Sequence, residues 1–287
     1  MDAPHLAPGT RLGAVHLNVS DLARSVAFYR EHIGLAPRDA AGDGTVAHLH
    51  AGGPDLLVLH GRPDAPRAPR ATGLYHVAYR VPSRAALGAT LMHLGASGTP
   101  LTGASDHGVS EAVYLPDPDD LGIEIYCDRP REAWTFVDGQ LRMVNDELDV
   151  RGLLAAAATA GPWTGLAAGS VIGHIHLHVG HIEAADHFYV GLLGFERVAR
   201  LGDSALFVAA GDYHHHVGLN TWRGVGAPPP PAGAIGLDHF VVELPDESER
   251  ERVAARLRTA GVKESAAPEG PAFEDPSTNR VALAVAG

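Results

Sequence analysis

The chain has 287 residues, a hydrophobic fraction of 45% and a net charge of -12, which is enough apolar sequence for one large domain or two of ordinary size. The negative net charge argues against a protein that binds nucleic acid or an anionic membrane, since binding to either needs a basic face. The single cysteine, Cys127, excludes an internal disulfide and fits the cytoplasm, and no apolar run approaches the ~20 residues that span a bilayer.

The first predicted elements are a strand and an amphipathic helix in residues 15–35, VHLNVSDLARSVAFYREHIGL. Ser20 or Asp21 is placed to cap this helix, and Gly34 is placed to end it. Short strands are expected to follow at 36–40, 45–50 and 55–60.

The next elements follow the same order. Residues 73–87, GLYHVAYRVPSRAAL, predict a strand and a helix, and 115–126, LPDPDDLGIEIY, predict a last strand. A segment of mixed composition, residues 128–170, then separates the two halves of the chain as a linker.

The second half repeats the first. Residues 175–195, IHLHVGHIEAADHFYVGLLGF, match 15–35, with a helix stop at Gly194. Further on, GLDHFVVELPDESER resembles GLYHVAYRVPSRAAL, and FEDPSTNRVALA corresponds to LPDPDDLGIEIY. Short strands are predicted after the third helix at 196–200, 205–210 and 214–220.

The strand GHIHLHV, residues 173–179, carries three histidines at alternate positions. Successive side chains of a strand point to opposite faces, so His174, His176 and His178 share one face. With 18 histidines in the chain, such a lining indicates ligands or proton carriers more than packing.

The sequence therefore predicts an α+β fold of four β-α-β-β-β modules, called modules one to four, near 12–60, 73–127, 171–222 and 234–286. One such half-sheet cannot bury both of its faces, so modules must pair around shared cavities. Along the chain, the expected domains are 12–127 and 171–286, joined by the linker 128–170.

The helices with AFY and DHFY, the stretch SDHGVSEAVYLPDPDDLGIEIYCDRP and the stretch GDYHHHVGLNTW resemble the vicinal oxygen chelate superfamily over almost the whole chain. This superfamily includes glyoxalase I, fosfomycin and bleomycin resistance proteins, and extradiol dioxygenases. The pattern is most similar to the four-module catechol 2,3-dioxygenases. The resemblance implies modules paired into incomplete barrels, with a metal held between paired modules.

In the family, one ligand lies on a module's first strand, fourteen residues before the helix phenylalanine, and another lies on its last strand, six residues after the proline of DP. Carried onto this chain, these positions give His76, Glu124 and His174 as ligands. Module one has Ala14 at the first-strand position, and module four offers His239 but has Ala282 at the last-strand position.

These losses favour pairing of modules two and three, with one and four paired together, because one cavity then holds two imidazoles and one carboxylate. His16, two residues after Ala14 on the same strand face, is the alternative partner for His76 and Glu124. In the remaining alternative, the histidines pack or bond locally and no metal binds.

The resemblance also implies catalytic residues. His215 matches the histidine that handles substrate and oxygen protons in extradiol enzymes, and His107 matches a stretch beside the pocket. Both have alternatives, a surface histidine cluster for the first and a turn cap for the second. The substrate-binding candidates are His176, His214, His216 and Tyr126.

One position departs from the family. Many of its extradiol enzymes carry a tyrosine where this chain has Ala112, so Tyr114 or Tyr126 is the expected substitute.

The function implied is an extradiol dioxygenase, an oxidoreductase of aromatic catabolism that uses Fe(2+) or Mn(2+) to open a catechol-type ring with O2. Its expected partners are therefore an aromatic diol and oxygen, with no nucleic acid or membrane. A homo-oligomer is left open. The alternatives are glyoxalase-like chemistry, which expects two carboxylate ligands, and a drug-binding resistance protein, which needs no metal.

Overall fold

The computed structural model describes residues 5–38, 44–137 and 140–287, and its elements follow the α+β pattern of four modules. Module one contains β1 (Arg11–Val19), α1 (Leu22–Phe28), the π-helical turn η1 (Tyr29–Ile33), β2 (Ala36–Pro37), β3 (Val46–His50) and β4 (Asp55–Gly61). Module two contains β5 (Gly73–Arg80), α2 (Arg84–Ala96), β6 (Gly103–Asp106), β7 (Ser110–Pro116) and β8 (Gly122–Asp128). The strand predicted at 36–40 is formed at 36–37, and positions 39 and 40 lie outside the described residues.

The linker holds short elements of its own: η2 (Arg131–Ala133), β9 (Phe136–Val137), β10 (Gln140–Leu141) and α3 (Val150–Ala157). Module three contains β11 (Val171–His178), α4 (Ile182–Asp186), η3 (His187–Leu193), β12 (Glu196–Leu201), β13 (Ala205–Ala209) and β14 (Val217–Asn220). Module four contains β15 (Gly236–Leu244), α5 (Glu247–Thr259), β16 (Glu264–Ala267), β17 (Gly270–Glu274) and β18 (Arg280–Val285).

Across the described ranges, these strands form two mixed sheets of eight strands each, besides the β10-β9 ribbon. The order β16-β17-β18-β15-β1-β4-β3-β2 combines modules four and one, and the order β12-β13-β14-β11-β5-β8-β7-β6 combines modules three and two. The predicted pairing of two with three and one with four is therefore confirmed in the sheets. Within a module, first and last strands run parallel, as in β5–β8, where Ala78 lies opposite Glu124, and β15–β18, where Val241 lies opposite Ala282.

The chain also divides into two compact units. Unit 1 comprises the described residues of 1–17, 65–75 and 173–287, and unit 2 comprises those of 18–64 and 76–172. None of the helices in the described ranges has the length and apolarity that crossing a membrane requires.

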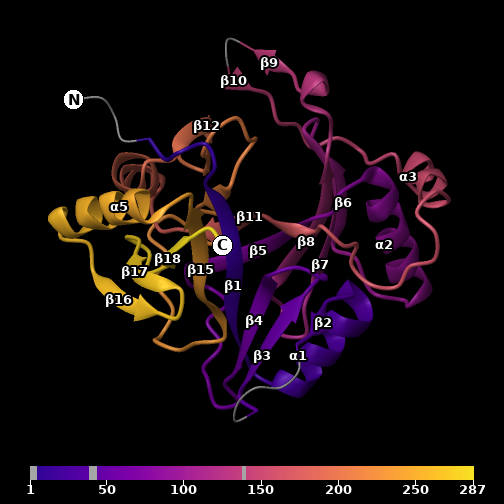
Figure 1. The fold of residues 1–287 in the computed structure, drawn as a ribbon, viewed down its shortest axis with the longest axis horizontal. Helices are drawn as coiled ribbons and strands as arrows, with labels where there is room; N and C mark the ends of the chain where they lie inside the picture. The colour runs from indigo at the N-terminus through magenta and orange to yellow at the C-terminus, as the bar shows by residue number, and fades with distance from the viewer. Residues whose placement is uncertain (1–4, 39–43, 138–139) are drawn as a thin grey trace. The chain divides into compact units, whose positions relative to one another are not determined.

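In unit 1, helix α5 covers strands β15 and β18 (Figure 1). Asp246 caps this helix by accepting a hydrogen bond from the Glu249 N–H. Val253 and Leu257 are fully buried on its inner face, and the Arg256 guanidinium donates to the Leu193 carbonyl at 2.6 Å, at the end of η3. The helix therefore ties module four to module three within this unit.

In unit 2, helices α2 and α3 lie side by side (Figure 1). Their close approach needs Gly88, because a Cβ at that position would lie 2.3 Å from the carbonyl oxygen of Leu153. Arg84 on α2 reinforces the region with two hydrogen bonds to the buried carboxylate of Glu111, at 2.7 and 3.0 Å. The second half of the linker is therefore packed against module two.

The two FY-containing helices end in the same way. In module one, Asp21 caps α1 by accepting from the Arg24 N–H, and the helix widens into η1. The N–H of Gly34 then donates to the Tyr29 carbonyl at 2.8 Å, in a left-handed conformation with φ 85°. Gly194 ends η3 with φ 97°, so both predicted helix stops are confirmed.

The tyrosine of each FY pair is buried against the aspartate of a DP turn. Tyr29 donates its hydroxyl to Asp117 at 3.2 Å in unit 2, and Tyr189 donates to Asp275 at 3.1 Å in unit 1. Burial raises the pKa of each aspartate to about 6. The strings that reveal the repeat thus join one module's helix to another module's last turn.

Candidate metal centre and its surroundings

The clearest site in unit 2 is a buried histidine–glutamate pair on two neighbouring strands. His76 on β5 and Glu124 on β8 share one face, since Ala78 two residues after His76 lies opposite Glu124. The Nε2 atom of His76 lies 3.0 Å from the Glu124 carboxylate, and the two residues are 6% and 2% exposed. A neutral imidazole and a carboxylate at this separation can bind one divalent cation together.

Tyr114 and His107 lie beside this pair. Tyr114 on β7 lies opposite Glu124, and its ring centroid is 5.8 Å from that of His76. The Val144 carbonyl can only accept, so His107 donates to it from Nδ1 at 2.9 Å and accepts the Tyr114 hydroxyl at Nε2, at 2.6 Å. Tyr114, one of the two expected substitutes for the tyrosine missing at position 112, is therefore hydrogen-bonded to a predicted catalytic residue.

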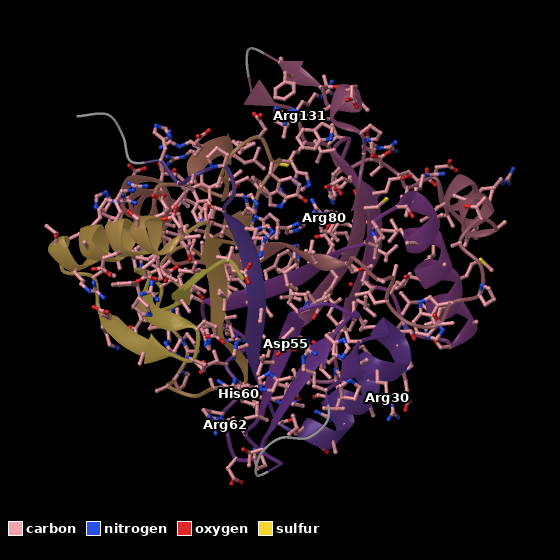
Figure 2. All side chains as sticks on the ribbon, in the orientation of Figure 1. Arg30, Asp55, His60, Arg62, Arg80 and Arg131 are labelled. Carbon is pink, nitrogen blue, oxygen red and sulfur yellow. The ribbon has the colours of Figure 1, made fainter. Side chains whose placement is uncertain are left out.

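The same strand face of unit 2 continues past the histidine–glutamate pair. Tyr126, predicted to bind substrate, is fully buried and packs against Ala78 and Ala112. Arg80, labelled in Figure 2, follows at the end of β5 and donates to the Asp128 carboxylate at 3.1 Å.

In unit 1, the three histidines of β11 are all buried, and each has its own surroundings. The ring of His174 lies 4.2 Å from that of His215. The Asn220 side-chain oxygen accepts two hydrogen bonds, one from the Trp222 N–H at 3.0 Å and one from Nδ1 of His178 at 2.7 Å.

The middle histidine, His176, is surrounded by aromatic rings. Tyr75, Trp222 and Phe207 have their ring centroids 5.1 to 5.6 Å from it. Gly218 opposite His176 makes room for the imidazole, since a Cβ there would lie 2.9 Å from its Cγ atom.

The segment YHHH, residues 213–216, corrects one expectation. The sequence predicts that this segment begins the strand at 214–220, but it precedes β14, which starts at Val217. His214 and His215 point toward each other, with their Nδ1 atoms 2.8 Å apart, so one of them donates and the other accepts. His216 accepts the Ala210 N–H at Nδ1, at 3.2 Å.

Within unit 1, the side chains of His16, His239 and Glu269 lie close enough together to hold a metal ion. His16, the alternative partner for His76 and Glu124, has its Nε2 atom 3.0 Å from the Glu269 carboxylate.

Glu269 is the residue that sequence reasoning missed. It occupies the two-residue turn between β16 and β17, away from the last strand on which the family positions are counted. Only its place in the turn PEG, next to a strand pair, distinguishes it in the sequence. Burial opposes ionisation of Glu269, but its interactions with His16 and His239 and a backbone hydrogen bond outweigh burial and lower the carboxyl pKa.

Cys127 is not a candidate nucleophile. It is a buried free thiol, and burial, followed by the charge of Glu111, raises its pKa to about 12. The thiolate form is therefore scarce at neutral pH, and the side chain packs as a small apolar group.

Residues 11–125 and 171–283 match the family model described as the Glyoxalase/Bleomycin resistance protein/Dioxygenase superfamily. A catechol-2,3-dioxygenase of Bacillus subtilis (strain 168) is 44% identical over 260 residues, which cover 88% of this chain and 89% of the relative.

Solved structures agree on the fold. Glyoxalase I from Zea mays covers 96% of this chain and 92% of its own, with a TM-score of 0.58 and 16% identity. The cppA protein from Streptococcus pneumoniae TIGR4 covers 99% of this chain and 100% of its own, with a TM-score of 0.55 and 12% identity. At these identities, the likeness concerns the fold alone.

Proposed function

Because the chain belongs to the Glyoxalase/Bleomycin resistance protein/Dioxygenase superfamily, we propose that it is a metal-dependent extradiol dioxygenase that opens a catechol-type ring with O2. The observation that carries this proposal is the buried His76–Glu124 pair beside Tyr114 and His107. The 44% identical catechol-2,3-dioxygenase supports the same reaction and the same class of substrate.

The proposed metal ligands are His76, Glu124 and His174, and the proposed ion is Fe(2+) or Mn(2+). Two imidazoles and one carboxylate leave positions open for small ligands, which suits these ions. When bound, such an ion supplies a positive charge that lowers the pKa of the catechol hydroxyls and gathers both reactants. A glyoxalase-type site, by contrast, expects a second carboxylate, and this ligand set has only Glu124.

His215 is the proposed proton acceptor for the second catechol hydroxyl. Its ring lies 4.2 Å from that of His174, and its Nδ1 atom shares a hydrogen bond with His214. A proton taken by His215 can therefore be held by the pair and returned later to the product side.

His107 has a separate proposed part, through Tyr114. Because His107 accepts the phenol hydrogen, the Tyr114 oxygen is kept oriented and its lone pairs can accept from a substrate hydroxyl. The wall that binds the aromatic ring would include His176, His214, His216 and Tyr126. The Tyr75, Trp222 and Phe207 rings around His176 support this, since a flat ring packs well against them. We also place the activity in the cytoplasm, where the thiol of Cys127 stays reduced.

The test is oxygen uptake with catechol by protein reconstituted anaerobically with Fe(2+) or Mn(2+). We expect a ring-opened product that has gained both atoms of O2, identified by mass spectrometry. Glu124→Ala should abolish turnover and the binding of the metal ion held by this ligand set while the protein stays folded, since alanine offers neither charge nor a ligand atom. Glu243→Ala removes a strand glutamate that pairs with Arg11 at 2.6 Å and serves as the control that keeps both.

Metal content equal to that of the wild type in the folded Glu124→Ala variant would rule out the proposed ligand. No oxygen uptake with any catechol by the metal-loaded wild type would rule out the proposed reaction. Turnover of a thiol–aldehyde adduct without oxygen would favour the glyoxalase-like alternative.

A further inference from the structure

Unit 1 contains a second cluster of ligand side chains, formed by His16, His239 and Glu269. His16 lies on β1, His239 lies on β15, and Glu269 lies in the turn between β16 and β17. The Nε2 atom of His16 is 3.0 Å from one carboxylate oxygen of Glu269, and the Nε2 atom of His239 is 3.1 Å from the other. Three different segments thus bring their polar atoms to one point.

The arrangement of the two imidazoles is unusual for packing alone. Their rings are stacked, with centroids 3.9 Å apart and an interplanar angle of 23°, and both residues are 2% exposed. Neutral imidazoles can stack in this way without charge repulsion, and each keeps one nitrogen lone pair that can bind a cation together with the Glu269 carboxylate.

The spacing of the ligand atoms suits a coordinated ion. Metal–nitrogen and metal–oxygen bonds of about 2.1 Å place adjacent ligand atoms about 3.0 Å apart in an octahedron and about 3.4 Å apart in a tetrahedron. The two nitrogen–oxygen distances at Glu269 are 3.0 and 3.1 Å, close to the octahedral value. All ligand atoms of the cluster lie within 4.8 Å of one another.

Asp238 orients one of the rings. Its carboxylate accepts from the Nδ1–H of His239 at 2.6 Å and is held in turn by the Arg280 guanidinium at 3.1 Å. In a neutral His239 this contact places the proton on Nδ1, which leaves the Nε2 lone pair for a cation bound between it and the Glu269 carboxylate. A carboxylate behind a histidine is the arrangement that supports metal-ligating imidazoles in other proteins.

The carboxylate comes from an unexpected place. The position on β18 that corresponds to Glu124 on β8 is Ala282, which lies opposite Val241. The β16–β17 turn supplies Glu269 instead. The Glu269 side chain is 24% exposed, whereas the histidine side chains are 2% and 3% exposed, so an ion can enter past the carboxylate.

We propose that His16, His239 and Glu269 form a second site for a divalent transition-metal ion, separate from the ligands proposed for catalysis. Two imidazoles and one carboxylate favour a borderline ion such as Zn(2+). The ion would join β1, β15 and the β16–β17 turn, so its first consequence is to stabilise unit 1.

The experiment measures Zn(2+) bound to metal-stripped full-length protein by equilibrium dialysis and elemental analysis, in a Glu124→Ala background. We expect Glu269→Gln to bind one Zn(2+) fewer per chain than the background. Glu264→Gln changes a glutamate of the same hairpin that pairs with Arg258 on the surface, so it is the matched control that keeps the ion. Asp238→Asn should weaken Zn(2+) binding by about 10–100-fold without removing a ligand.

Two further measurements test the same site. Zn(2+) should raise the midpoint of thermal unfolding of the control but not of the Glu269→Gln variant. His16→Asn removes a ligand from another strand and gives an independent reading if Glu269→Gln does not fold. Equal Zn(2+) content in folded Glu269→Gln and Glu264→Gln would overturn the second site, whatever the outcome with catechol.

Discussion

At the scale of single residues, histidines of the same module have different surroundings. His174 is a proposed metal ligand on β11, whereas His215 lies in the segment before β14 and shares a hydrogen bond with His214. His216 accepts a hydrogen bond from the backbone N–H of Ala210. Proximity in sequence therefore does not assign a function, and each imidazole has to be judged by its own contacts.

This difference predicts that two histidine variants of module three behave differently. His215→Ala should keep the metal and still bind catechol, while turnover falls by about 10²–10⁴, the usual contribution of a positioned acid or base. His174→Ala should lose metal and turnover together, because it removes one of three proposed ligands. Metal content and kcat of each variant, measured on the same preparations, check the comparison.

Two outcomes would contradict this assignment. Loss of the metal from His215→Ala would make His215 a ligand. Full turnover in that variant would pass the acid–base function to His107 and Tyr114.

At the scale of elements, the FY helices depend on glycines that end them. Gly34 is left-handed, with φ 85°, and a Cβ there would lie 2.3 Å from the Leu166 backbone nitrogen, which donates to the Gly34 carbonyl. Gly98 after helix α2 is also left-handed, with φ 65°, but it has no atom within 4 Å of such a Cβ. The two positions share the backbone requirement and differ in packing.

Gly34→Ala should therefore destabilise the protein more than Gly98→Ala. We expect Gly98→Ala to lower the free energy of unfolding by about 1–2 kcal/mol, the backbone cost alone. Gly34→Ala should lose about 2 kcal/mol more, because the Leu166 contact must also move. Urea unfolding of both variants measures the difference, and equal losses would show that the segment at Leu166 adapts without cost.

At the scale of the whole molecule, the internal repeat places one buried tyrosine–aspartate pair in each compact unit. The pKa values of Asp117 and Asp275 are raised to about 6 by burial, against an ordinary value of 3.8. The folded protein thus keeps these two protons between about pH 4 and 6, where the unfolded chain has lost them. The contribution of each pair to the free energy of unfolding falls as pH rises through this window.

The predicted effect of Asp275→Asn is a change in this pH dependence. The free energy of unfolding of the variant, relative to that of the wild type, should rise by about 1–3 kcal/mol as the pH increases from 4 to 7. The reason is that asparagine needs no proton to stay neutral. Asp120→Asn, an exposed change in the corresponding DP turn of module two, should leave the slope as it is. Unfolding free energies at several pH values test the prediction, which fails if the difference between wild type and Asp275→Asn is constant with pH.

The sequence by itself determined the elements and the family. Local signals suffice for a helix that ends at Gly34, because the glycine is needed by its own backbone angle. They also suffice for the shared face of the β11 histidines, which follows from strand alternation. Matched strings and complementary losses at Ala14 and Ala282 predicted the module pairing, while the domain division at residues 128–170 stays a prediction.

Only the tertiary structure decided what depends on turns and on distant contacts. The segment YHHH leaves the strand pattern because its histidines bond to one another and to Ala210. Glu269 joins His16 and His239 from a hairpin turn, which no spacing along β18 can reveal. A ligand's position depends on where the chain folds back, and that is determined by the packing of segments far apart in sequence, whereas strand and helix periodicity depends on neighbours alone.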